Sequence, residues 1–460
     1  METTSSASTK DASPAQVGFA EAFWVWARIG WLSFGGPAGQ IALMHRELVE
    51  RRGWISNTRF MQALNFCMLL PGPEAQQLAV YIGWLMHRVR GGVVAGAMFV
   101  LPGMLVLGVL SWVYVRYGNA SIVMAAFFGL KAAMLAVVVE AVLRIGRRAL
   151  TGPFDIVLAA CAFIAIHAFD VPFPWVVVIA GAIGMVRGIH SGATASTPAP
   201  ESRRFIVDTL IERGEAAHLL PSWRRALRTM IVLSVLWFTP VLSAAWWLGA
   251  DHVVTREGWF FSRAAVVTFG GAYAVLAYVA QRAVEDFGWL RPGEMVDGLA
   301  LAETTPGPLI MVLQFVGFVA GHRLHGGLDP WVAAVLGALM TTWVTFLPSF
   351  LFVLVGGPFV ESLRRQPTLQ AALSAITAAV VGVVLNLSVW FATHTIFRQS
   401  TQFSVGRLRV EAPVLHSVEP MALAIAIAAL VATLRFKMGI GWVLAGSTLL
   451  GALYWFTKQS

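Results

Sequence analysis

The chain has 460 residues, of which 57% are hydrophobic and only 12% are charged. Soluble proteins carry about 25% charged residues, so this composition excludes an ordinary soluble domain. The net charge of +9 comes from arginines scattered between apolar stretches, a pattern typical of membrane-protein loops and not of a nucleic-acid-binding domain. The sequence therefore predicts an all-α polytopic membrane protein, with the lipid bilayer as its surroundings and no nucleic acid as a partner.

In chain order, residues 1–16 are a polar tail that lacks the basic and apolar regions of a signal peptide. Apolar stretches then fill residues 17–188 and, later, residues 250–460. Between them we predict a hydrophilic linker at 189–225, placed in the cytoplasm by its arginines, and a connecting transmembrane helix at 226–249. Since a spanning helix needs about 20 residues, the whole pattern predicts about 13 membrane segments, among them segments at about 57–87 and 293–321.

Short motifs of the first apolar region recur in the second at a constant spacing. Three motifs return 235 positions later: Phe34-Gly35-Gly36 as Phe269-Gly270-Gly271, Gly53-Trp54 as Gly288-Trp289, and Pro71-Gly72-Pro73 as Pro306-Gly307-Pro308. This regularity indicates two homologous halves that arose by duplication. Six segments in the first half plus one connecting helix would turn the second half upside down. That is the inverted repeat of many secondary transporters.

Both halves carry Pro-Gly-Pro inside an apolar run, and proline breaks a helix because it lacks the backbone donor. Within a bilayer a broken helix is tolerated only where it is buried or lines a cavity. A helix that restarts at Pro73 or Pro308 would direct its free N–H groups and positive dipole end into the protein, which suits an anion. The corners at Gly35-Gly36-Pro37 and Gly270-Gly271 give a weaker form of the same signal. The competing interpretation is a pair of tight turns that bind no ligand.

Three basic residues are candidates for the same anion site. Lys131 lies in the middle of an apolar run, where a cation costs about 2.5–3.5 kcal/mol to insert. The alternative is a structural lysine that is neutralised by Glu140. Arg28 and Arg263 each precede the Phe-Gly-Gly motif of their half by six residues, and each either faces the site or extends to the membrane interface.

Polar residues cluster beside the two breaks. Glu74 and Gln77 follow the first break, and Glu303 precedes the second. A carboxyl group in a dry site favours its neutral form, so Glu74 and Glu303 are candidate proton-coupling residues. Alternatively, each caps the N-terminus of a half-helix. The predicted substrate-binding residues are Lys131, Arg28, Arg263, Gly35, Gly36, Pro37, Pro71, Gly72, Pro73, Gln77, Gly270, Gly271, Pro306, Gly307 and Pro308.

The sequence lacks the motifs that several other functions require. The sequence has no Cys-x-x-Cys pair and no clustered histidines, so we expect no metal and no cofactor. It also has no phosphate-binding loop of the Gly-x-x-x-x-Gly-Lys-[Ser/Thr] type, which argues against transport driven by ATP. A membrane enzyme would need a nucleophile and a base, and no Ser/His/Asp grouping is visible. We therefore predict that the protein is not an enzyme.

The set Phe34-Gly35-Gly36-Pro37, Gly53-Trp54 and Pro71-Gly72-Pro73-Glu74 with Gln77 resembles the signature of the chromate ion transporter family. The repeated motifs make the chain similar to the long, fused two-domain members, over about residues 17–456. The resemblance implies a bacterial inner-membrane protein that exports chromate, confers resistance to it, and is driven by the membrane potential or a proton gradient. The second half departs from the signature, with Ala272 and Leu309 where the first has Pro37 and Glu74.

Other functions remain open at this point. Chromate and sulfate are tetrahedral dianions of similar shape, so a sulfate or other oxyanion carrier is an alternative. An anion channel is another, because broken helices also serve channels, although an asymmetric duplication favours a carrier. Protons are a candidate coupling ion, and a homodimer is a candidate assembly.

Overall fold

The computed structural model describes residues 17–34, 36–118, 120–169, 171–190, 206–207, 219–269, 272–291, 293–359, 366–405 and 408–459. The predicted tail and most of the predicted linker lie outside the described residues. The elements of the first half and the connecting helix are α1 (Phe19–Leu32), α2 (Gly36–His45), the π-helical turn η1 (Arg46–Arg51), α3 (Asn57–Leu69), α4 (Glu74–Tyr117), α5 (Ser121–Ala149), α6 (Pro153–Phe169), α7 (Phe173–His190) and α9 (Trp223–Trp247).

The second half repeats this order of elements and adds a short hairpin. Its elements are α10 (Val253–Val267), α11 (Ala272–Gln281), η3 (Arg282–Asp286), α12 (Glu294–Thr304), η4 (Leu309–Met311), α13 (Val312–Arg323), α14 (Pro330–Gly356), η5 (Gly357–Phe359), α16 (Pro367–Ile396), β1 (Ser400–Val405), β2 (Leu408–Pro413), η6 (Leu415–Ser417), α17 (Pro420–Leu434) and α18 (Ile440–Gln459). The antiparallel pair β1–β2 departs from the predicted all-α class, which treated this segment as a loop.

The two halves agree even in fine detail. Each carries a π-helical turn, η1 or η3, just before the Gly-Trp motif. The glycines of that motif, Gly53 and Gly288, have φ of 61° and 60°. The N–H groups of Trp54 and Trp289 each donate over 2.8 Å to a carbonyl six residues earlier. Equivalent sequence motifs therefore form equivalent local structures.

The two halves differ in how the helix after the Pro-Gly-Pro break connects to the next helix. Helical geometry in α4 is interrupted at His87 and Arg88, where Arg88 has φ of 55°. The equivalent point of the second half opens into a loop between α13 and α14. Asp329 ends that loop by capping α14, because its carboxylate accepts the N–H groups of Trp331 and Val332. The extra residues of the second half therefore separate two helices that the first half joins.

Five helices among the described residues are long and apolar enough to span a membrane: Glu74–Tyr117, Val123–Ala149, Trp223–Trp247, Pro330–Phe359 and Thr368–Ile396. Other predicted segments form shorter helices. The predicted span 57–87 divides into α3 and the start of α4, and the predicted span 293–321 divides into α12, η4 and α13. In both cases the division falls at Pro-Gly-Pro, where proline cannot continue the helix.

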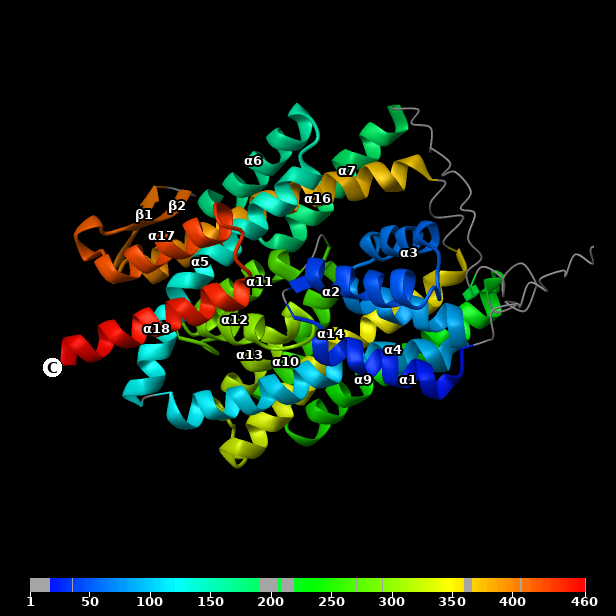
Figure 1. Ribbon diagram of the computed structural model, residues 1–460, viewed down its shortest axis with the longest axis horizontal. Helices are drawn as coiled ribbons and strands as arrows, with labels where there is room; N and C mark the ends of the chain where they lie inside the picture. The colour runs from blue at the N-terminus through cyan, green and yellow to red at the C-terminus, as the bar shows by residue number, and fades with distance from the viewer. Residues whose placement is uncertain are drawn as a thin grey trace, which may run out of the picture.

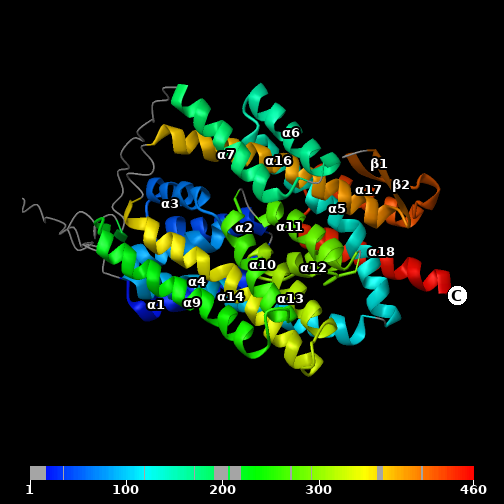
Figure 2. The same cartoon turned by 180° about the vertical axis from the view of Figure 1, so that it is seen from behind.

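The long helices α4, α14 and α9 run side by side along the long axis of the molecule (Figure 1 and Figure 2). Helices α5, α6 and α7 pack against α16, while α17 and α18 cover another part of α5. Gly92 of α4 faces Leu354 of α14, and Gly96 faces Phe350. The residue numbers rise on one helix as they fall on the other, so α4 and α14 pack antiparallel. Side chains of both halves share the largest buried apolar cluster.

Close packing of α5 on α18 gives a first prediction. A methyl group on Gly129 would lie 1.9 Å from the carbonyl oxygen of Ser447, whereas a methyl group on Gly146 of the same helix would lie 3.7 Å from its nearest neighbour. We expect Gly129→Ala to lower the free energy of unfolding by about 1–3 kcal/mol, the usual result of overpacking. Gly146→Ala is the matched control. Thermal unfolding in detergent, followed by tryptophan fluorescence, measures both, and equal midpoints would contradict this packing argument.

Candidate functional site

The two Pro-Gly-Pro breaks are held by the opposite halves of the chain. The N–H of Gly72 donates over 2.7 Å to the carbonyl oxygen of Thr268, at the end of α10. The N–H of Gly307 donates over 2.8 Å to the carbonyl oxygen of Ser33, at the end of α1. Adding 235 to Gly72 and Ser33 gives Gly307 and Thr268, so these two hydrogen bonds are a reciprocal pair.

Further contacts follow the same reciprocity. Gly72 lies against Ser349 of α14, and Gly307 lies against Gly103 of α4. Ser349 and Gly103 are equivalent positions, because each follows a Leu-Pro pair and the two pairs are 246 residues apart. Both break glycines have positive φ, 127° at Gly72 and 97° at Gly307, which side chains other than glycine rarely adopt. The breaks, with the ends of α1 and α10, form one region that we call the central junction.

Glutamine side chains complete the central junction. The side-chain amide of Gln40, in α2, donates to the Gly307 carbonyl oxygen over 2.6 Å. The side-chain amide of Gln77 donates to the Pro71 carbonyl oxygen over 2.7 Å. Since the Gly72 and Gly307 N–H groups are also bonded, the donors left for an anion are those in the first turns of the helices that begin there.

The structure places most of the predicted break residues at these helix starts. Pro73 precedes the first residue of α4, Glu74, and Pro308 precedes η4. At the corner of the first half, Gly36 begins α2 with φ of 71°, and Pro37 follows in its first turn. The predicted residues Gly35, Gly270 and Gly271 lie outside the described residues.

Lys131 forms an ion pair, but its partner is not the one that the sequence suggested. Its Nζ lies 3.1 Å from Oδ2 of Asp297, in α12, and the hydroxyl of Tyr114 donates to the same oxygen over 2.8 Å. Asp297 is 3% exposed. Glu140 instead pairs with Arg144, one turn further along α5. The lysine of the first half is thus neutralised by an aspartate of the second half.

This ion pair lies apart from the second break. Asp297 precedes Glu303 by six residues, which is about 9 Å along a helix axis. Glu303 is buried and accepts a 2.7 Å hydrogen bond from the hydroxyl of Tyr273, in the first turn of α11. The Arg144–Glu140 pair of α5 is close enough to act on the charge of Glu303. Helix α12 therefore carries two buried carboxyl groups, one near each end, of which Asp297 pairs with Lys131 of α5.

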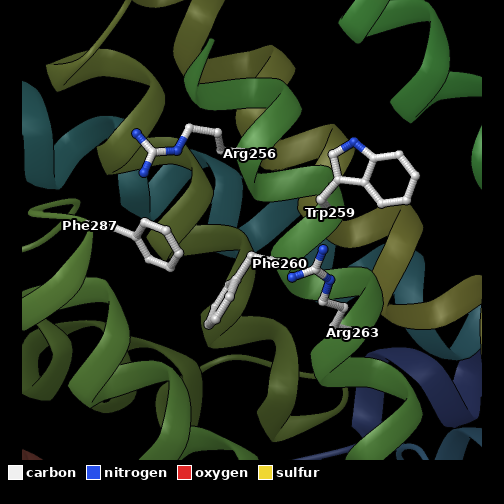
Figure 3. A pocket seen from close by; sticks show the side chains of 5 residues that line it. All are labelled: Arg256, Trp259, Phe260, Arg263 and Phe287. Atoms are coloured by element: carbon white, nitrogen blue, oxygen red, sulfur yellow. The ribbon is translucent and has the colours of Figure 1, made fainter. Parts of the chain in front are cut away.

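Arg28 and Arg263 are both exposed, so neither lies in the buried part of the central junction. Arg263 instead lines a pocket of about 350 Å³ together with Arg256, Trp259, Phe260 and Phe287. Figure 3 shows the aromatic ring of Phe260 between the two arginines. The guanidinium of Arg256 lies 5.2 Å from the centre of the Phe287 ring, a cation–π contact. The pocket therefore combines two positive charges with aromatic walls.

The first half has no such combination of charges. At the offset of 235, Arg256 and Phe287 correspond to Glu21 and Arg52. Those two residues form an ion pair, with 3.4 Å between Arg52 Nη1 and Glu21 Oε1. The first half thus neutralises the charge that the second half exposes in its pocket. The equivalence of Arg28 and Arg263, read from the sequence, does not extend to their surroundings.

Sequence reasoning missed the aspartate and the two tyrosines that contact the predicted residues. A signal for Asp297 existed, because it is an acidic residue within the predicted span 293–321 and a buried lysine needs an acidic partner. Tyr114 and Tyr273 gave no signal, since tyrosine is common in membrane helices for other reasons.

Comparison with known proteins agrees with this architecture. The sequence profile of the chromate transporter family matches residues 20–185 and 256–452. The chain is 34% identical over 382 residues to the chromate transport protein of Pseudomonas aeruginosa, covering 82% of each chain. It is 27% identical over 380 residues to the chromate transport protein of Cupriavidus metallidurans, covering 80% of this chain and 81% of that one. A probable chromate transport protein of Synechococcus elongatus is 26% identical over 363 residues, covering 78% of this chain and 80% of that one. No solved structure matches the chain.

The fold and the matched profile define a helical membrane transporter of many segments, not an enzyme. The chain belongs to the chromate transporter family. The two matched regions fall within the two halves that the sequence repeat defines, and the unmatched stretch between them, residues 186–255, contains the linker and the whole of α9.

Proposed function

We propose that this protein is a secondary transporter that exports chromate from the cytoplasm and thereby confers chromate resistance. Family membership and the names of the relatives support chromate as the ion. The observation that carries the transport mechanism is the reciprocal pair of hydrogen bonds, Gly72 to Thr268 and Gly307 to Ser33. Each half holds the broken helix of the other, so a relative movement of the halves changes both breaks together.

The same contacts support an inverted repeat. The second part of α4 and helix α14 are equivalent in the two halves, and they pack antiparallel. Equivalent contacts that are exchanged in both directions are the mark of a two-fold relation. Antiparallel packing of equivalent helices supports an axis in the membrane plane, the arrangement that many secondary transporters use for alternating access. Counting the shorter helices with the long ones then gives about 13 membrane segments.

For the bound dianion we propose two positions. At the central junction, the first turns of α2 and α4 supply N–H donors, and Gln77 lies beside them. Lys131 takes part when it leaves Asp297, because an anion competes with the carboxylate for the same ammonium group. The second position is the pocket of Arg256 and Arg263, where two arginines attract the ion before or after it passes the junction.

We also propose the setting in which this transport takes place. The protein lies in the bacterial inner membrane, with the linker 189–225 in the cytoplasm and the bilayer around its many helices. The membrane potential or a proton gradient drives export, and Glu74 and Glu303 are candidate proton carriers. A homodimer is the proposed assembly.

Flux measurements test this function directly. Everted membrane vesicles that contain the protein are expected to take up labelled chromate when a proton gradient is imposed, and vesicles without it are not. Sulfate in excess is the competitor. Sulfate uptake without chromate uptake would move the substrate to another oxyanion. A flux too fast to saturate with chromate concentration would indicate an anion channel instead of a carrier.

A further inference from the structure

Glu257 is a buried carboxyl group that neither the junction nor the Lys131 pair uses. It lies in the second turn of α10, its residue is 0% exposed, and neither of its carboxyl oxygens has a hydrogen-bond partner among the described residues. Burying an unpaired carboxylate is strongly unfavourable. The group is therefore neutral in this conformation, which means that it holds a proton.

No cation among the described residues compensates Glu257. Helix α10 packs against α14, α9, α13 and α11. Helix α14 has no charged residue in its sequence. The other three helices carry charged or titratable side chains. These are Arg224, Arg225 and Arg228 near the start of α9, His322 and Arg323 at the end of α13, and Tyr273 and Tyr278 on α11. None of these forms an ion pair or hydrogen bond with the Glu257 carboxyl group in the described structure.

The Glu257 carboxyl group lies at the start of a row of unpaired hydroxyls on α14. A methyl group on Gly337 would lie 2.8 Å from its Oε2, and one turn further along α14 the buried hydroxyl of Thr341 also has no partner. Thr345 and Ser349 follow at the same spacing of four residues, both buried and both unpaired. Side chains four apart on a helix are about 5–6 Å from each other, a gap that one water molecule bridges.

This absence of partners contrasts with several other hydroxyls at helical positions among the described residues, although Thr395 of α16 also has no partner. Ser33, Ser111 and Thr433 each donate to the carbonyl oxygen four residues earlier, the usual arrangement for a hydroxyl within a helix. Thr342, next to Thr341, does the same. The hydroxyls of Thr341, Thr345 and Ser349 make no such hydrogen bond and stay available to other partners.

The row ends at the first break. Ser349 lies against Gly72, and the Gln76 side chain, fully buried in the first turn of α4, has no partner on its amide nitrogen or its oxygen. A row of buried, unpaired polar groups thus extends along α14 from the contact with Glu257 to the contact with Gly72 at the central junction. Buried polar groups without protein partners are the ones that water molecules satisfy in proteins.

We propose that Glu257 is a proton-binding residue that exchanges its proton with the central junction along Thr341, Thr345 and Ser349. Water at the junction donates the proton to the carboxylate in one conformation and receives it back in the other. This inference rests on the proposed transport function and names its proton site, at a position distinct from Glu74 and Glu303. Coupling follows because only the neutral carboxyl group fits these buried surroundings, where no cation pairs with it among the described residues.

Purified protein in liposomes tests the inference by two fluxes. In wild type, an imposed pH gradient with the potential clamped drives chromate uptake, and chromate–chromate exchange proceeds at equal pH. We expect Glu257→Gln, which mimics the neutral acid, to reduce gradient-driven uptake by at least about tenfold while exchange stays within about twofold. Thr345→Val, which removes only the hydroxyl, reduces gradient-driven uptake to a lesser degree. Glu50→Gln, on an exposed side chain, is the matched control.

Infrared difference spectroscopy gives a readout that does not depend on transport. Among the carboxylic-acid bands, to which Glu74 and Glu303 also contribute when protonated, one that is present in wild type should be missing in Glu257→Gln. If Glu257→Gln retains wild-type gradient-driven uptake, or if the band persists in it, Glu257 is not the proton site. If wild type exchanges no chromate, the proposed function fails, and the infrared band still decides whether Glu257 binds a proton. Should Glu257→Gln fold poorly, Thr345→Val decides, and unchanged gradient-driven uptake in it overturns the proposed row.

Discussion

Replacing Lys131 with alanine is expected to reduce both the stability of the protein and chromate flux. The change leaves Asp297 buried without its cation, held only by the hydroxyl of Tyr114. Removing one partner of a fully buried pair costs about 3–5 kcal/mol, because the other charge is left uncompensated. The Lys131 side chain is 32% exposed, so we expect a loss near the lower end, about 3 kcal/mol.

The double variant Lys131→Ala/Asp297→Asn separates structure from function. With both charges removed, no buried carboxylate is left unpaired, so the thermal midpoint should return most of the way to that of wild type. If Lys131 also binds the transported anion, flux in the double variant stays at least about tenfold below wild type. Stability is read from thermal unfolding and flux from labelled chromate in liposomes. Recovery of both together would show that the lysine has only a structural role.

The single variant Asp297→Asn completes a double-mutant cycle with the two variants above, and we expect a different result from it. This variant frees the Lys131 ammonium group from its carboxylate partner, so the lysine is available to an anion at all times. We expect tighter chromate binding with slower release, because the competing carboxylate is gone. The interaction free energy of the pair follows from the four stabilities of the cycle.

The breaks could be predicted from the sequence because they depend on local chemistry. A proline cannot donate a backbone hydrogen bond whatever surrounds it, so Pro-Gly-Pro within an apolar run marks a helix end without tertiary information. The constant offset of 235 residues between motifs can also be read from the sequence without any structural information. The duplicated order of helices is a prediction from these two signals, and the turns at Gly53 and Gly288 have matching φ values of 61° and 60°.

The partners of the charged residues could not be predicted because they are far apart in the sequence. Lys131 meets Asp297, 166 positions later, and the sequence pointed instead to Glu140, which is nearer. The exposure of Arg28 and Arg263 was also not predictable. In a membrane helix the lipid-facing side chains are as apolar as the core, so hydrophobic periodicity does not tell one face from the other. On α1, Trp24 and Trp31 are exposed although both are apolar.

Gly72→Ala is expected to abolish most transport by distorting the central junction. A methyl group on Gly72 would lie 2.7 Å from both the side-chain amide nitrogen of Gln77 and the hydroxyl oxygen of Ser349, and φ of 127° is strained for any residue with a side chain. Such backbone strain costs about 1–3 kcal/mol, and relieving it would move the N–H of Gly72 away from the Thr268 carbonyl. Chromate flux should fall at least about tenfold, since small displacements of this kind cost large factors in rate.

The equivalent glycine of the second half, Gly307, allows the expected loss of chromate flux to be compared between the two breaks. Gly307→Ala places its methyl group 3.3 Å from Gly103, a less severe contact, so its flux should fall less than that of Gly72→Ala. Gly441→Ala, where a methyl group meets nothing within 4 Å, is the control and should transport normally.

The difference between the two breaks has an identifiable source, because Ser349 stands where the other half has Gly103. Removing that side chain in Gly72→Ala/Ser349→Gly gives the first break the surroundings of the second and should restore flux toward the level of Gly307→Ala. Recovery cannot be complete, because Gln77 still contacts the new methyl group. If the double variant transports no better than Gly72→Ala, the contact with Ser349 is not what limits the first break, and backbone strain together with the Gln77 contact accounts for the loss.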